Sequence, residues 1–105
     1  RRFIVMGTML ELGEESVLLH EEVANFISQS NVDGIVIVSD GEEAKVMSDA
    51  TKDLAFSVIV STPEAALPYL KSWLSAEDTL LLKGSRAIGL ERLLPLLQGL
   101  EEDFS

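Results

Sequence analysis

The polar stretch at residues 83–86 holds the side chains best suited to bind an anion. Lys83, Ser85 and Arg86 occur there, directly after the apolar run at residues 79–82 and before apolar residues at helical spacing. This order is typical of a buried parallel strand that leads through a polar loop into a helix. Backbone N–H groups in such a loop, together with the helix dipole, can hold a negatively charged group. Lys83 is the strongest single candidate, because a lysine at the end of a buried strand is costly unless it meets an anion.

A second polar loop follows the apolar run at residues 3–6. It contains Thr8 and Glu11, between Gly7 and Gly13. In an open α/β sheet, ligands bind beyond the carboxyl ends of the strands, where the strand order reverses. If the first and fourth strands are neighbours, this loop and the loop at residues 83–86 should face one crevice. Two polar loops of this kind indicate a binding crevice rather than a catalytic centre.

Two familiar phosphate-handling motifs are incomplete in this chain. Residues 84–89 have the glycine spacing of a P-loop, but Leu90 and Glu91 stand where a lysine and a hydroxyl residue must follow. Thr62 and Lys83 follow strands as in phosphoryl receivers, yet the first strand is not followed by the acidic pair that would bind Mg²⁺. Neither a P-loop nor a receiver site is therefore expected.

The acidic and histidine residues form no evident catalytic or metal site in the sequence. Adjacent glutamates occur at helix starts or on exposed helix faces, where acids compensate the helix dipole. The single histidine, His20, cannot form a multi-histidine metal site, and we expect it to pack or cap within its helix. The chain has no cysteine, which excludes thiolate chemistry and fits a reducing compartment. The sequence therefore assigns no catalytic residue and no metal ligand.

Apolar runs and helical patterns alternate four times along the sequence. Strands are expected at residues 3–6, 35–38, 56–60 and 79–82, and helices at residues 15–30, 42–50, 63–74 and 87–98. This alternation predicts an α/β, three-layer Rossmann-like domain, with a mostly parallel sheet of order 3-2-1-4 and helices on both faces. Four strands are few for such a sheet, which leaves room for further edge strands upstream of residue 1.

The spacing of apolar residues also predicts which helix faces are buried. Thr62 followed by Pro63 marks the start of the third helix, with a hydroxyl cap and a proline in the first position. In the first helix, four residues at helical spacing are predicted to face the core: Leu19, Val23, Phe26 and Ile27.

Length and charge exclude several classes of partner. At 105 residues, 47% of them apolar, the chain is expected to fold as one domain. Its formal net charge of −10 leaves no basic surface for the phosphates of nucleic acid. No apolar run approaches the roughly 18 residues that a membrane span needs. Neither nucleic acid nor a membrane is therefore expected as a partner.

Three stretches together resemble a known family. Residues 7–13, residues 19–23, and residues 82–86 with Leu90 and Glu91 resemble the C-terminal domain of the Mur ligases, in order and at family-like spacing. Within that family the resemblance is greatest to the ligases that add D-alanyl-D-alanine to UDP-N-acetylmuramoyl-tripeptide in peptidoglycan synthesis. It implies that residues 1–105 are a single C-terminal domain, excised from a longer three-domain enzyme.

The family's chemistry supplies further expectations. The resemblance implies an ATP-dependent amide ligase in which one domain holds the UDP-sugar, a P-loop domain holds ATP and Mg²⁺, and this domain presents the amino acid or dipeptide. ATP and Mg²⁺ would be bound mainly by the missing domains, so the isolated chain should hold no cofactor and be inactive. Its partners would be the dipeptide, the UDP-muramoyl-peptide and the other domains of the same polypeptide. The expected location is the bacterial cytoplasm, or the plastid stroma for a plant-type homologue.

The resemblance also implies roles for individual residues. Lys83, Ser85 and Arg86 would hold the dipeptide carboxylate or the negative charge that develops near the activated acid. Thr8 and Glu11 would line the facing loop, with Glu11 orienting the substrate ammonium. Two positions depart from the family pattern, since Thr8 replaces a usual aspartate and Ala24 a usual glycine. The alternatives are a Mur-type ligase for a different amino acid and a noncatalytic binding module on the same scaffold.

Overall fold

Strands and helices alternate along the chain in the computed structural model, which describes residues 1–7, 15–39, 41–83 and 93. The elements, in chain order, are β1 (Arg2–Gly7), α1 (Ser16–Gln29), β2 (Gly34–Val38), α2 (Glu42–Ala50), β3 (Phe56–Val60), α3 (Pro63–Trp73) and β4 (Thr79–Lys83). The predicted alternation is therefore confirmed for this part of the chain.

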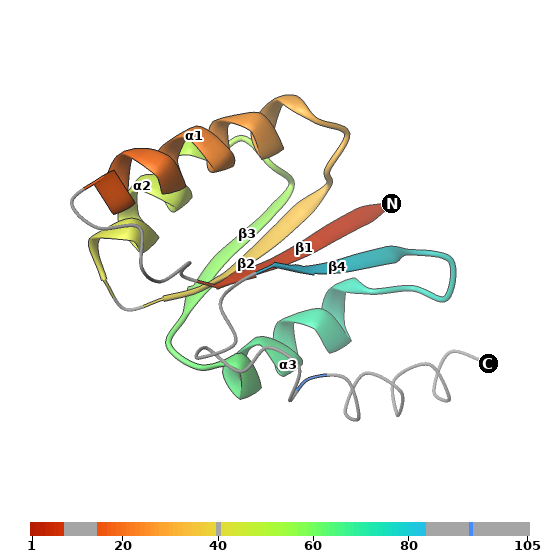
Figure 1. The fold of residues 1–105 in the computed structure, drawn as a ribbon. Helices are drawn as coiled ribbons and strands as arrows, with labels where there is room; N and C mark the ends of the chain where they lie inside the picture. The colour runs from red at the N-terminus through yellow and green to blue at the C-terminus, as the bar shows by residue number, and fades with distance from the viewer. Residues whose placement is uncertain (8–14, 40, 84–92, 94–105) are drawn as a thin grey trace.

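The strands form one parallel sheet in the order β3-β2-β1-β4, as predicted. Val5, in the middle of β1, pairs with Val36 of β2 and with Leu82 of β4. Figure 1 shows α1 and α2 together over one face of the sheet and α3 on the other. Because the two central strands lie between helices on both sides, they are buried along nearly their whole length.

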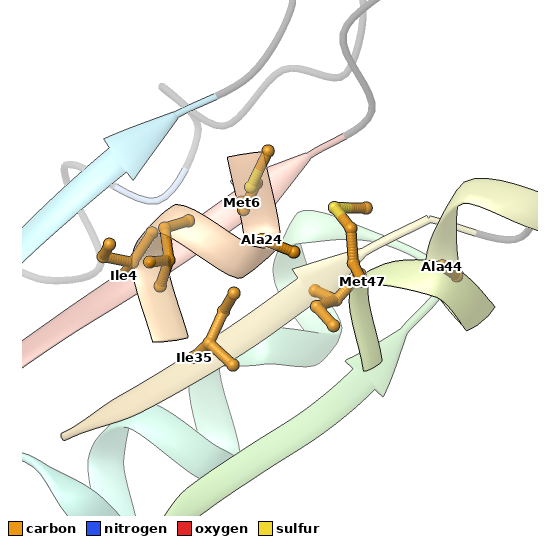
Figure 2. Close-up of a cluster of buried hydrophobic side chains, with 8 residues drawn as sticks. Ile4, Met6, Ala24, Ile35, Ala44 and Met47 are labelled. Carbon is orange, nitrogen blue, oxygen red and sulfur yellow. The ribbon is translucent and has the colours of Figure 1, made fainter. Parts of the chain in front are cut away.

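Each face of the sheet carries its own apolar cluster. The first cluster lies between the sheet and the α1–α2 pair, and Figure 2 shows Ala24 of α1, Met47 of α2 and Ile35 of β2 among its members. The second cluster lies on the α3 face: Val5, Val36, Val38, Val60, Ala66, Leu70 and Leu93. Leu93 is helical and fully buried there. The rest of the helix predicted at residues 87–98 lies outside the described residues.

The start of α3 follows from its sequence. The Thr62 hydroxyl accepts a hydrogen bond from the backbone N–H of Ala65, at 3.3 Å, and Pro63 occupies the first turn. A side-chain acceptor at this position satisfies one of the N–H groups that the first helical turn leaves without a partner. The predicted cap is therefore confirmed.

The predicted inner face of α1 is wrong at Phe26, whose side chain is 72% exposed. The buried residues of this helix are His20, Ala24 and Ile27. Ala24 belongs to the same cluster as Ala44 and Met47 of α2, so a small side chain lies where the two helices meet. The predicted apolar stripe included Phe26, but the buried face of α1 is the face that packs on the sheet and on α2, and Phe26 lies outside that face.

The prediction of a fully buried fourth strand is also wrong. Along β4, half-buried residues alternate with exposed ones, and the Leu81 side chain is 47% exposed. Leu80 and Leu82 pack against the second cluster, on the α3 face. Because successive side chains of a strand point to opposite faces, Leu81 and Lys83 lie on the α1 face. In the described residues β4 is an outer strand that is covered on one face only.

Three aromatic side chains, those of Phe3, Phe56 and Trp73, pack together on the α3 face at the amino end of the sheet. The Phe3 ring lies 5.5 Å from that of Phe56 and 6.3 Å from that of Trp73, measured between ring centroids. The two phenylalanines meet across Gly34, which pairs with both of them in the register of the sheet. A Cβ atom at Gly34 would lie only 2.7 Å from Phe3 Cδ1 and from Phe56 Cβ. Glycine at this position is therefore what allows the two rings to touch.

Arg1 ties the start of β1 to the start of β4. Its guanidinium donates hydrogen bonds to Asp78, with Nη2 3.0 Å from Oδ2, and to the Trp73 carbonyl oxygen at 2.8 Å. The same group lies over the Phe3 ring, 5.3 Å from its centroid. The amino end of the sheet is thus held by the polar contacts of Arg1 as well as by the packing of the aromatic side chains.

Candidate functional site

The carboxyl ends of the strands lie in one row, which is the predicted position of the binding crevice. Gly7 pairs with Val38, Val38 pairs with Val60, and Met6 pairs with Lys83. Because the strands are parallel, α1, α2 and α3 all begin near this edge, where their positive dipole ends would favour an anion. The expectation that the first and fourth strands are neighbours is confirmed.

Lys83 is the one predicted site residue that lies among the described residues. It is the last residue of β4, pairs with Met6, and is exposed. Our reason for singling it out, the cost of burying a lysine, therefore does not apply. What remains is its position, at the carboxyl edge of the strand next to β1.

The other four predicted residues, Thr8, Glu11, Ser85 and Arg86, lie outside the described residues. The structure nevertheless fixes the strands that precede these residues in the chain. The segment containing Thr8 follows β1, and the segment containing Ser85 follows β4, which is the neighbour of β1. That these residues line one crevice stays a prediction.

A hydrogen bond between side chains joins α1 to α2 near the carboxyl edge of the sheet. The Ser16 hydroxyl donates to Glu43 Oε1 at 2.9 Å. His20 Nδ1 lies 2.6 Å from the backbone oxygen of Ser16. Since a carbonyl oxygen can only accept, Nδ1 carries the proton and donates it to this bond. The His20 side chain is fully buried, which confirms the expectation of a packed histidine.

The carboxyl group of Glu43 is stabilised in its ionised form. A hydrogen bond from its own backbone N–H lowers the pKa of Glu43 below the usual 4.5, and the bond from Ser16 and the electrostatic effect of His20 lower it further. Partial desolvation opposes these effects. Glu43 is therefore a structural acid that helps to hold the two helices together.

We expect Glu43→Gln to change how the stability of the chain depends on pH. A lowered pKa in the folded state stabilises the fold above the usual value of 4.5, and this contribution is lost as the pH falls through the lowered pKa. The advantage of the wild type over Glu43→Gln should therefore shrink on acidification. Urea unfolding at neutral pH and below pH 4.5 measures this difference.

Glu42→Gln is a matched control, because Glu42 is exposed and the substitution removes the same charge one position earlier in α2. Its effect should change less with pH than that of Glu43→Gln. If the difference between wild type and Glu43→Gln is the same at both pH values, Glu43 has no such role.

Reasoning from the sequence missed the link between Ser16 and Glu43. The two residues are 27 positions apart and belong to different helices, so no local pattern relates them. The only local signal is the separation of four residues between Ser16 and His20, which places both on one side of a helix. Glu43 was grouped with acids that compensate a helix dipole, and its partner on α1 could not be inferred.

The described residues give no sign of a metal centre or of a membrane segment. No three histidine, aspartate or glutamate side chains among them gather where they could hold a metal ion. No helix in this part of the chain combines the length and the apolar character needed to cross a bilayer.

Comparisons with known sequences give a consistent result. The sequence model of the family described as "Mur ligase, glutamate ligase domain" matches residues 1–86. A UDP-N-acetylmuramoyl-tripeptide–D-alanyl-D-alanine ligase from Mycobacterium leprae is 31% identical over 103 residues, covering 94% of this chain and 20% of the relative. The ligase of the same name from Haemophilus influenzae is 30% identical over 92 residues, covering 86% of this chain and 20% of the relative.

Solved structures share the fold. MurF ligase from Thermotoga maritima, in complex with ADP, matches with a TM-score of 0.76 and 28% identity over 100% of this chain. MurF from Acinetobacter baumannii matches with a TM-score of 0.74 and 26% identity over 91% of this chain. The chain spans only 22–23% of those two proteins, and about a fifth of the curated relatives.

Proposed function

Because this chain belongs to the family described as "Mur ligase, glutamate ligase domain", we propose that it is the C-terminal, dipeptide-presenting domain of a longer ligase. That ligase would add D-alanyl-D-alanine to UDP-N-acetylmuramoyl-tripeptide in peptidoglycan synthesis. The observation that carries the proposal is the match over residues 1–86, together with relatives that bear this ligase name. Residues 1–105 would form a single domain of the enzyme, in the cytoplasm or in a plastid stroma.

Lys83, Ser85 and Arg86 would hold the dipeptide carboxylate or the negative charge that develops during the reaction. A carboxylate gains both from the dipole at a helix start and from charge-assisted hydrogen bonds. The exposure of Lys83 suits this role, because its ammonium group is accessible at the carboxyl edge of the sheet. Bringing the dipeptide to the activated acid would make catalysis largely a matter of positioning and electrostatics.

Thr8 and Glu11 would line the loop that follows β1, opposite the loop that follows β4. Glu11 would orient the dipeptide ammonium, so that its nitrogen can attack the carbonyl carbon of the activated acid once a proton is lost. Because Thr8 replaces an aspartate that is usual in the family, the crevice would hold one carboxylate fewer.

ATP and Mg²⁺ would be bound mainly by other domains of the longer ligase. Among the residues that the structure describes, no three histidine, aspartate or glutamate side chains gather where they could hold a metal ion. The sequence likewise lacks the lysine and hydroxyl that complete a P-loop after residue 89. ATP would supply the activation of the acid substrate, and this chain would supply the incoming amine.

Two other functions remain as alternatives. A Mur-type ligase for a different amino acid is favoured by the change at Thr8, because the lost carboxylate would alter the pocket around the substrate ammonium. A noncatalytic binding module would share the scaffold and lack the reaction, since a fold alone does not determine function.

The test is ligase activity of the full-length protein with ATP, Mg²⁺, UDP-N-acetylmuramoyl-tripeptide and D-Ala-D-Ala. Phosphate release that requires the dipeptide is expected, and the 105-residue chain alone should neither hydrolyse ATP nor form amide bonds. Turnover only with another amino acid would favour the related ligase. No turnover with any amino acid or dipeptide, from a folded protein, would favour the binding module.

A further inference from the structure

Ser16, in the first turn of α1, is held through both its side chain and its backbone. Its hydroxyl donates to Glu43 Oε1 at 2.9 Å, and its carbonyl oxygen accepts the bond from His20 Nδ1 at 2.6 Å. Glu15, at the cap position of the helix, provides no side-chain cap in the part of the chain that the structure describes. The bond to Glu43 therefore anchors the start of α1 to a different element.

The partner of Ser16 is itself fixed at the start of α2. Glu43 accepts a hydrogen bond from its own backbone N–H, and its half-buried side chain lies over Gly41, the cap residue of that helix. A Cβ atom at position 41 would lie 2.7 Å from Glu43 Oε2, so the absence of a side chain there leaves room for the carboxylate. Glu43 thus offers Ser16 an acceptor whose position is set by α2.

The connection from β1 to α1, residues 8–14, starts and ends beside residues that contact β2 or α2. At one end, Gly7 pairs with Val38 of β2 in the register of the sheet. At the other end, Ser16 is bound to Glu43, which follows Val38 by only five residues. The turn from β2 to α2 therefore places both ends of this connection.

We propose that Ser16 and Glu43, through the hydrogen bond between them, are positioning residues for binding of the dipeptide. Thr8 and Glu11, which the proposed function places in the crevice, lie between Gly7 and Ser16 in the chain. Loss of the bond would free the start of α1 from α2, and so displace the group that would orient the dipeptide ammonium. A displacement of about 1 Å can be costly at a reacting centre. The inference rests on the proposed function, because it takes Glu11 to contact the dipeptide.

Two substitutions break the bond from opposite sides, and two conservative ones preserve it. Ser16→Ala removes the donor, and Glu43→Ala removes the acceptor. Ser16→Thr keeps a hydroxyl, whereas Glu43→Gln removes the charge but keeps a carbonyl oxygen that can accept. The matched controls are Ser30→Ala, which removes a hydroxyl bond at the other end of α1, and Asp78→Ala, which removes a hydrogen-bonded carboxylate at the amino end of the sheet.

Steady-state kinetics of the full-length protein would give KM for the dipeptide, for ATP and for UDP-N-acetylmuramoyl-tripeptide. We expect Ser16→Ala and Glu43→Ala to raise KM for the dipeptide about three- to tenfold, the effect of losing one hydrogen bond, and to leave the other two KM values unchanged. The double variant should be no worse than either single one, because both remove the same bond.

The conservative variants, Ser16→Thr and Glu43→Gln, should stay near the wild-type KM, as should the two controls. A role in stability alone would not give this pattern, because a smaller amount of folded enzyme lowers the measured kcat and leaves KM unchanged.

Two results would overturn the proposal. The first is a KM for the dipeptide that is unchanged in both alanine variants, or that rises equally with the other two KM values. The second is a rise in Glu43→Gln as large as that in Glu43→Ala, with Ser16→Ala at the wild-type value. That result would assign the effect to the charge of Glu43 rather than to its bond with Ser16.

The wild-type protein separates this inference from the proposed function. Turnover by the wild type, with unaltered KM values in the variants, would support the ligase and reject the positioning role. A folded wild type without turnover would reject the ligase and, with it, a role for Ser16 in dipeptide binding.

Discussion

Lys83→Ala in the full-length protein should lower kcat/KM for the dipeptide in the proposed ligase reaction by about 10²- to 10³-fold, the usual effect of removing one preorganised donor to developing charge. Lys83 ends β4 in register with Met6, at the carboxyl edge where the helices begin. An ammonium group there would attract the dipeptide carboxylate and the negative charge of the reacting acid. Its removal would therefore weaken substrate binding, transition-state stabilisation, or both.

Steady-state kinetics separate these two effects. A rise in KM with unchanged kcat would place Lys83 on the carboxylate of the bound dipeptide, whereas an equal fall in kcat and kcat/KM would place it on the transition state. Lys45→Ala is the matched control, since Lys45 is an exposed lysine of α2 and should be neutral. An unchanged kcat/KM in Lys83→Ala would remove this residue from the site.

Phe3→Ala should destabilise the chain by about 3–5 kcal/mol, the range found when a buried aromatic side chain is truncated. Phe3 is 1% exposed, and its ring contacts those of Phe56 and Trp73. The substitution leaves a cavity between β1, β3 and α3 and removes the ring beneath the Arg1 guanidinium. Urea unfolding of the 105-residue chain, followed by circular dichroism, measures the loss.

Phe26→Ala is the control for this prediction, because it removes the same side chain from a position that is 72% exposed. We expect it to change the stability of the 105-residue chain little, as most exposed substitutions do. Equal destabilisation by the two variants would show that burial of Phe3 is not what stabilises the amino end of the sheet.

Much of the fold could be predicted because its determinants are local. Short apolar runs separated by helical patterns lead to a parallel sheet, and the handedness of the crossovers then restricts the order of its strands. The start of α3 is likewise encoded by two adjacent residues, Thr62 and Pro63. These features do not depend on which other parts of the chain lie nearby.

The errors concern surfaces whose burial depends on distant neighbours. Phe26 fits an apolar stripe on α1, but the contact of Ala24 with α2 determines which side of the helix is covered. Leu81 belongs to an unbroken apolar run, yet nothing within the described residues covers its face of β4. At the candidate site, the exposure of Lys83 and the bond between Ser16 and Glu43 likewise depend on how separate elements pack.

Gly34 has a consequence for how this sheet can evolve. A side chain at position 34 would collide with Phe56 at its Cβ, an atom that every residue except glycine possesses. It would also collide with the ring of Phe3, which a smaller residue at position 3 would avoid. With phenylalanine at position 3 and any residue but glycine at position 56, a side chain at position 34 would require the neighbouring strands to shift, so position 34 is restricted to glycine in this sheet.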